Sequence, residues 1–101
     1  MNDDALKKGI LDDCLLKYAV RVITVCRALP KSYIGIHIGK QMLRSGTSAG
    51  ANYQEAVGSE SRRDFVHKMQ LSLKELRETL FWLRVINETK ILTPERLASI
   101  I

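Results

Sequence analysis

The sequence has few of the residues that tight turns and β-sheets require. It contains 2 Pro, 6 Gly and 2 Cys in 101 residues, and aromatic residues make up only 6%. So few turn formers argue against a β-sandwich or a β-barrel, which need a turn after each short strand. A chain of this length has room for one domain, residues 1–101, which excludes an enzyme with separate cofactor and substrate domains.

Long apolar runs are also missing. No run approaches the ~18 residues of a membrane span. The N-terminal segment MNDDALKKGILDD carries acidic residues where a secretory signal peptide carries basic ones. We therefore expect a cytoplasmic protein without membrane contact, in which residues 1–10 form a flexible or frayed N-terminus.

The two cysteines cannot form an internal disulfide if the stretch that carries them is helical. A helix rises ~1.5 Å per residue, which places Cys14 and Cys26 roughly 18 Å apart, whereas a disulfide requires Cα atoms within about 7 Å. We expect both thiols to pack as small apolar residues. Together with His37 and His67 they lack the paired spacing of zinc ligands, so no metal is expected.

Apolar residues recur at intervals of three and four over residues 11–29, 32–58 and 61–88, which predicts three long helices. Pro30 ends the first helix, and Ser32 and Ser61 are positioned to cap the next two. The run Thr93-Pro94-Glu95 is a start signal for a fourth. The predicted fold class is all-α, an antiparallel up-down four-helix bundle whose last helix is short or truncated.

The helical faces carry more apolar surface than a simple bundle needs. The apolar arc of the first helix covers about 200°, twice the ~100° of an ordinary surface helix, which predicts packing on two sides, by the bundle or by another subunit.

Gly46 and Gly50 interrupt the second helix, and either another helix approaches them closely or a loop divides the segment. The predicted core stripes of the second and third helices are Ile34, Ile38, Met42, Ser45, Ala49, Tyr53 and Ala56, and Phe65, Met69, Leu73, Leu76, Leu80 and Leu83.

The net charge of +5 is concentrated in the first half of the chain. Residues 14–54 contain no acidic residue, and such a basic surface can neutralise phosphates and release counterions. The alternative is a solvated face that only keeps the protein soluble, because no aromatic stacking platform is interleaved with the basic residues. The candidate nucleic-acid-binding residues are Lys17, Arg21, Arg27, Lys31 and Lys40.

Several polar residues fall on or beside the apolar stripes: Arg44, Asn52, Glu55, Glu75 and Glu78. A di-iron bundle would need Glu-x-x-His on two helices, and the sequence has none. Acid–base catalysis by Glu55, Glu75 and Glu78 would need a nucleophile or a pocket signature, which is also missing. We interpret the five residues as a buried hydrogen-bonding network that fixes helix register, and expect no cofactor, metal or enzymatic activity.

The chain from about residue 14 to 100 resembles the four-helix-bundle family named after the 23S rRNA intervening-sequence protein. The resemblance rests on Arg44-Ser45, Ser48, Ala51-Asn52 and Glu55, followed by Phe65, Glu75, Glu78-Thr79 and Trp82-Leu83. It implies a small bacterial four-helix bundle that forms a ring-like homopentamer. The accessory protein of diversity-generating retroelements is similar in fold, and binds nucleic acid and a reverse transcriptase through a basic surface. The biochemical role of the family itself is largely unassigned.

Two functional hypotheses follow. The first is a non-enzymatic homopentamer whose basic surface, on the first two helices, binds RNA or DNA. The second is a protein-interaction scaffold or accessory subunit whose partner is encoded by a neighbouring gene, with no direct nucleic-acid contact.

Overall fold

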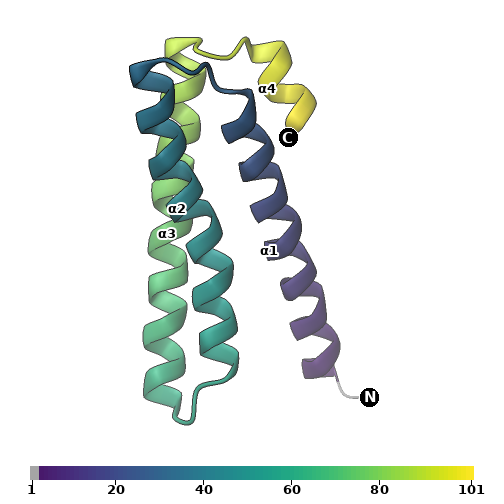
Figure 1. Cartoon of the computed structure of the whole chain (residues 1–101). Helices are drawn as coiled ribbons and strands as arrows, with labels where there is room; N and C mark the ends of the chain where they lie inside the picture. Colours follow the sequence, from purple (N-terminus) through teal and green to yellow (C-terminus); the bar gives the residue numbers. More distant parts are fainter. Residues whose placement is uncertain (1–2) are drawn as a thin grey trace.

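The computed structural model describes the backbone of residues 3–101 and the side chains from residue 9 onward. It contains four helices, α1 (Asp3–Ala28), α2 (Tyr33–Val57), α3 (Arg62–Thr89) and α4 (Pro94–Ile100), and no strand in that part of the chain. Successive helices run in opposite directions, and α4 lies beside the C-terminal end of α1 (Figure 1). The predicted all-α, four-helix fold is confirmed, with a last helix of 7 residues.

The helix boundaries follow from capping residues that the sequence displays. The Ser32 hydroxyl oxygen accepts a hydrogen bond of 3.1 Å from the Gly35 amide, and Ser61 accepts one of 3.0 Å from Asp64. Thr93 caps α4 in the same way, with proline at the first helical position. Each hydroxyl satisfies an amide that the helix itself leaves without a partner. The predicted starts of α2, α3 and α4 are therefore confirmed.

The first helix is longer than its apolar pattern predicts. It begins at Asp3 rather than near Leu11. Residues 3–10 include alanine, leucine and two lysines, which favour a helix without supplying an apolar stripe. Residues 1 and 2 lie outside the described part of the chain, and fraying of residues 1–10 stays a prediction.

Gly46 lies where α1 and α2 approach most closely. A β-carbon at this position would lie 2.5 Å from Cγ1 of Val22 on α1, closer than real side chains come. At Gly50 the nearest atom would be Cβ of Leu15 at 3.9 Å, which is ordinary contact. The helix runs through both glycines, so the alternative of a loop in this segment is wrong. The close approach of α1 therefore explains the glycine at position 46 but not the one at position 50.

The core has two parts. An apolar cluster lies at the end of the bundle that α4 covers, and it contains Val22, Val25, Leu29, Ile38, Met42, Ile86, Leu92 and Leu97. Nearer the other end, α2 and α3 meet through small and hydroxyl side chains. The Ser45 and Thr79 hydroxyls lie 2.7 Å apart, and Ser72 donates a hydrogen bond of 2.7 Å to the carbonyl of Ala49. We call this contact the hydroxyl seam.

The predicted core stripe of α3 is wrong for three of its six residues, while Met69, Leu76 and Leu83 are half-buried. Phe65, Leu73 and Leu80 are exposed, whereas the buried residues of α3 are Ser72, Thr79 and Ile86. The reason is that α3 docks on α2 through the hydroxyl seam, which turns the leucines away from α2. The short α4 packs beside α1 (Figure 1). Ile34 of α2, also predicted as core, is exposed as well.

The two cysteines differ in how deeply their side chains are buried. Both are free, but Cys14 is exposed, so its predicted apolar packing is wrong. Cys26 is half-buried with its sulfur 3.6 Å from the carbonyl oxygen of Gly39, and burial raises the pKa of its thiol.

Candidate nucleic-acid interface

The five basic residues singled out in the sequence all have exposed side chains. Lys17, Arg21 and Arg27 project from α1, Lys31 lies in the connection to α2, and Lys40 lies on α2. Within the described residues, the ion pairs are formed by Arg44 and Lys68, so none of the five is held by a carboxylate. Cations without an acidic partner remain available to an anionic ligand.

Three of the five meet in one groove. Arg27, Lys31 and Lys40 line a groove of about 490 Å³ where the C-terminal end of α1 turns into α2. Apolar side chains complete its lining, among them Leu29, Pro30, Ile36 and Leu43. Lys17 and Arg21 lie further back along α1, outside the groove. We call this feature the elbow groove.

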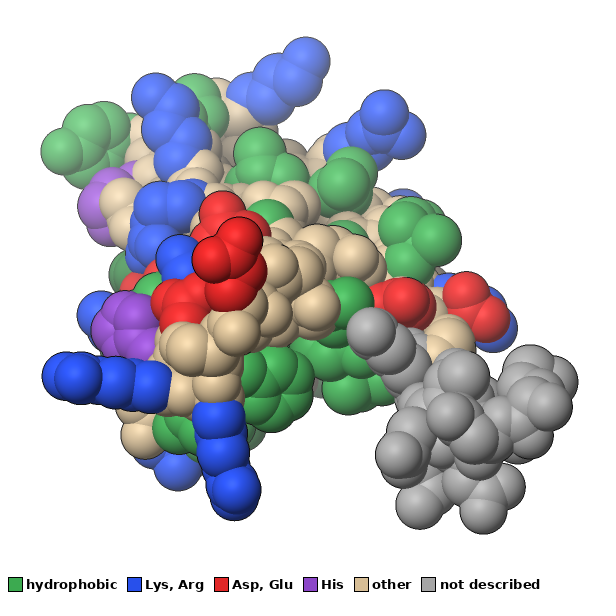
Figure 2. Space-filling view, turned by 90° about the horizontal axis from the view of Figure 1, so that it is seen from below, with side chains coloured by type: hydrophobic (Ala, Val, Ile, Leu, Met, Phe, Trp, Pro, Cys, Tyr) green, Lys and Arg blue, Asp and Glu red, His purple; other side chains and the backbone are tan. Residues whose placement is uncertain are grey.

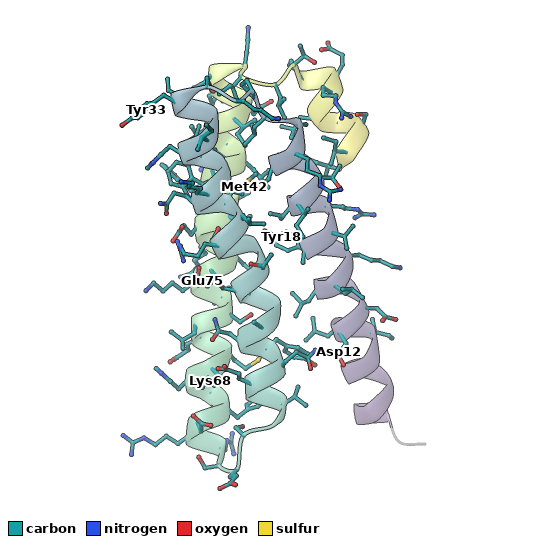
Figure 3. The ribbon with its side chains drawn as sticks, viewed as in Figure 1. Asp12, Tyr18, Tyr33, Met42, Lys68 and Glu75 are labelled. Carbon is teal, nitrogen blue, oxygen red and sulfur yellow. The ribbon has the colours of Figure 1, made fainter. Side chains whose placement is uncertain are left out.

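An aromatic side chain that the sequence analysis missed lies next to these cations. The Tyr33 side chain is 92% exposed and points away from the bundle at the start of α2 (Figure 3). It follows Lys31 by two residues and precedes Lys40 by two helical turns. The sequence pattern indicated no aromatic stacking platform among the basic residues, and Tyr33 is the exposed aromatic side chain that this interpretation did not consider. Its position outside the apolar stripe of α2 was the signal that could have found it.

The predicted polar network forms only in part, and at the surface rather than in the core. Arg44 of α2 forms ion pairs with Glu75, at 3.1 Å, and with Glu78, both on α3. The indole nitrogen of Trp82 donates a hydrogen bond of 3.2 Å to the same Glu78 oxygen. The Arg44 side chain is 49% exposed, so these contacts bridge the outer edge of the two helices.

The other two members of that network lie elsewhere. The amide of Asn52 donates a hydrogen bond of 3.0 Å to the Ser48 carbonyl of its own helix. Glu55 pairs with Lys68 at 2.9 Å, and both line an open groove of about 660 Å³ at the connection between α2 and α3. The carboxylates that an enzyme would have to combine are thus divided between two places. Within the described residues there is no group of three or more His, Cys, Asp or Glu able to hold a metal ion.

The Arg44 pair predicts a pH dependence of stability. The hydrogen bond from Arg44 lowers the pKa of Glu78, and the bond from Trp82 adds to this effect. A carboxyl with a depressed pKa stabilises the fold above its unfolded pKa of about 4.3, and this stabilisation is lost as the pH falls through the lower folded pKa. We expect Glu78→Gln to lower the melting temperature by about 2 to 4 °C at pH 7, because the pair is partly solvent-screened.

Thermal unfolding followed by circular dichroism between pH 7 and about pH 3 would test this, since the difference should disappear toward the acidic end. Glu88→Gln on the exposed surface of α3 is the matched control, and a pH-independent loss in Glu78→Gln would contradict the assignment.

The described helices include none that combines the length and apolar character needed to cross a bilayer.

Comparison with known proteins gives a family match and a solved relative. Residues 14–101 match the family model described as 23S rRNA-intervening sequence protein. A similar solved structure is a protein of unknown function from the S23 ribosomal protein family of Bacteroides thetaiotaomicron VPI-5482. It is 39% identical with a TM-score of 0.82, and the match covers 93% of this chain and 84% of that one. No curated protein matches the chain.

Proposed function

This chain belongs to the 23S rRNA-intervening sequence protein family, and from that premise we propose that it is a non-enzymatic, homo-oligomeric helical bundle that binds RNA or DNA. The binding surface is formed by Lys17, Arg21, Arg27, Lys31 and Lys40 on α1, α2 and their connection. The observation that supports this function most directly is that these cations are exposed and have no carboxylate partner, in a stretch of sequence without acidic residues.

The size of the exposed surface supports self-association. The isolated chain exposes 7231 Å², whereas a compact monomer of this mass exposes about 5,800 Å². Its radius of gyration is 15.3 Å, compared with about 13 Å for a compact domain of this length. The excess of roughly 1,400 Å² is nearly twice the ~800 Å² that each partner buries in a standard protein–protein interface, and each subunit of a ring contributes to two interfaces.

Part of that surface is an apolar face of α3. Phe65, Val66, Leu73 and Leu80 are exposed there, and together with Leu76 they form what we call the α3 stripe. Leu11 of α1 joins the stripe to close a shallow apolar groove of about 390 Å³. In the end-on view of Figure 2 hydrophobic side chains lie at the lower middle and along the upper side, and Lys and Arg side chains project from the upper, left and lower edges.

The proposed occupant of the α3 stripe is another copy of the chain. Apolar contacts of this extent are buried in obligate homo-oligomers. Five copies in a ring is the assembly that the family resemblance implies. Oligomerisation through α3 leaves the basic surface on α1 and α2 free, and it repeats that surface once per subunit, which multiplies the affinity for a long polyanion.

Nucleic-acid binding should weaken steeply with salt and with charge reversal on α1. A Lys17→Glu, Arg21→Glu double variant is expected to bind generic RNA at least tenfold more weakly at low salt. The slope of log affinity against log salt should become shallower by about 1.5 to 2, because two phosphate contacts are lost. Fluorescence anisotropy with labelled RNA over about 50 to 300 mM salt measures both quantities.

The control for that experiment is Arg63→Glu with Lys74→Glu on α3, which changes the net charge equally at exposed positions away from the proposed basic surface and from the helix face that carries Leu73 and Leu80. Both double variants should keep the helical content of the unaltered protein. Affinity that does not respond to salt, or no binding at low salt, would contradict the proposal. In that case the alternative of an accessory subunit gains support, with the α3 stripe contacting a protein partner that survives nuclease treatment.

A further inference from the structure

The elbow groove combines positive charge with apolar surface, and a contact with phosphates alone would not need the apolar surface. Arg27, Lys31 and Lys40 supply three positive charges around it, and no acidic residue lines it. Leu29, Pro30, Ile36 and Leu43 supply an apolar lining. A DNA or RNA duplex offers side chains its phosphates and the edges of its bases, whereas the apolar faces of its bases are covered by stacking. An apolar lining among cations therefore matches an unstacked base next to its phosphate.

Tyr33 extends this surface on α2. Residues three and four apart are neighbours on a helix, so Tyr33 lies beside Ile36, which lines the elbow groove. Lys40 lies two turns further along the same helix. The tyrosine ring is almost fully exposed and makes no hydrogen bond within the described residues. Aromatic rings of this kind are the usual stacking partners of bases in single strands.

We propose that the elbow groove is a single-strand subsite, in which Arg27, Lys31 and Lys40 hold successive phosphates while one base lies against the apolar lining and the next stacks on Tyr33. This inference rests on the proposed nucleic-acid function and adds a preference for unpaired over duplex nucleic acid. The volume of about 490 Å³ suits one nucleotide-sized group. The rest of the strand then follows the outer side of α1, where Arg21 and Lys17 continue the positive charge.

The first test separates stacking from charge. Binding of a labelled 12-nucleotide oligo(U), the matching oligo(dT) and a 12-base-pair duplex is compared for the unaltered protein, Tyr33→Ala and Tyr33→Phe. Tyr33→Ala should weaken binding of both single strands about tenfold and leave duplex binding unchanged. Tyr33→Phe should retain single-strand affinity, because the ring is preserved. The substitution is at an exposed position, so thermal unfolding should be unaltered.

The second test determines which cations contact the phosphates. Arg27→Gln with Lys31→Gln is compared with Arg62→Gln and Arg63→Gln, which remove the same charge at the opposite end of the bundle. The first pair should weaken oligo(U) binding at least tenfold, and the second by less than threefold. An oligonucleotide carrying 4-thiouridine should crosslink to the peptide that contains Tyr33. Inorganic phosphate should displace the oligonucleotide no better than chloride at the same ionic strength, since phosphate alone gains nothing from the apolar lining.

The outcomes distinguish this inference from the function on which it rests. If Lys17→Glu with Arg21→Glu weakens binding but Tyr33→Ala changes nothing, nucleic-acid binding stands and the single-strand subsite is wrong. Equal losses for single strand and duplex in Tyr33→Ala, or stronger displacement by inorganic phosphate than by chloride at equal ionic strength, also overturn the subsite. No binding of any nucleic acid at low salt overturns both.

Discussion

Glutamate at both Leu73 and Leu80 is expected to convert the oligomer into a monomer of 11.4 kDa. The two leucines are two helical turns apart on one face of α3, and their side chains are 49% and 57% exposed in the isolated chain. Exposure means that the substitution does not disturb the core of the subunit. Association would bury both carboxylates against apolar surface without a counter-charge, which costs several kcal/mol per subunit contact. Light scattering coupled to size exclusion measures the mass directly.

A matched control exists on α2. Ile36 and Leu43 are also exposed, also two turns apart, and lie on the elbow groove rather than the α3 stripe. Ile36→Glu with Leu43→Glu should therefore keep the mass of the unaltered oligomer. An unaltered chain that is monomeric throughout the micromolar range would refute self-association, and an intact oligomer in the α3 variant would place the interface elsewhere.

Among the glycine-to-alanine substitutions, each of which adds one methyl group, Gly35→Ala is expected to destabilise the fold most. A β-carbon at this position would overlap the carbonyl oxygen of Pro30, and the Ser32 hydroxyl oxygen would be only 3.2 Å away. The obstacle is backbone, which cannot rotate aside as a side chain can, so the connection between α1 and α2 must shift. We expect a loss of about 3 kcal/mol, at the upper end for overpacking, and a melting temperature lower by roughly 10 to 20 °C.

Gly39→Ala provides the comparison one turn later on the same helix. There a β-carbon would meet only Cδ1 of Leu29 at 3.6 Å, which is ordinary contact. Alanine should thus leave stability unchanged or raise it by up to about 1 kcal/mol through its greater helix propensity. Denaturant unfolding of both variants gives the two free energies. Equal stability of the two variants would show that the start of α2 can move without cost.

Local features of the fold could be predicted because short-range chemistry determines them. Ser32, Ser61 and Thr93 define helix starts through hydrogen bonds to residues three positions later, whatever the rest of the chain does. The packed face of α3 could not be predicted in this way. Hydrophobicity favours the side with Leu73 and Leu80, but the observed contact uses Thr79 against Ser45 of α2. Which side of a helix is buried depends on its neighbour, and a single sequence does not contain the neighbour's position.

In the candidate site, too, features that one segment determines could be predicted, and features that depend on the packing of two helices could not. The absence of acidic residues from 14 to 54 predicts a basic surface, yet Arg44 lies in this stretch and pairs with Glu75 and Glu78 of α3, so the pairing of each cation depends on the neighbouring helix. The sequence did not predict that Arg27, Lys31 and Lys40 meet in one groove, since this depends on the angle between α1 and α2. It also grouped Asn52 and Glu55 with Arg44, although helix spacing fixes only which residues share a face. Pairing across helices requires their relative register as well.

The α3 stripe would have a thermodynamic consequence in the proposed oligomer. Phe65, Leu73 and Leu80 stay partly exposed in the single chain, so only part of their apolar area contributes to its folding. In the proposed oligomer another copy covers the rest, so the folded fraction should depend on protein concentration by mass action, and dilution should lower the melting temperature.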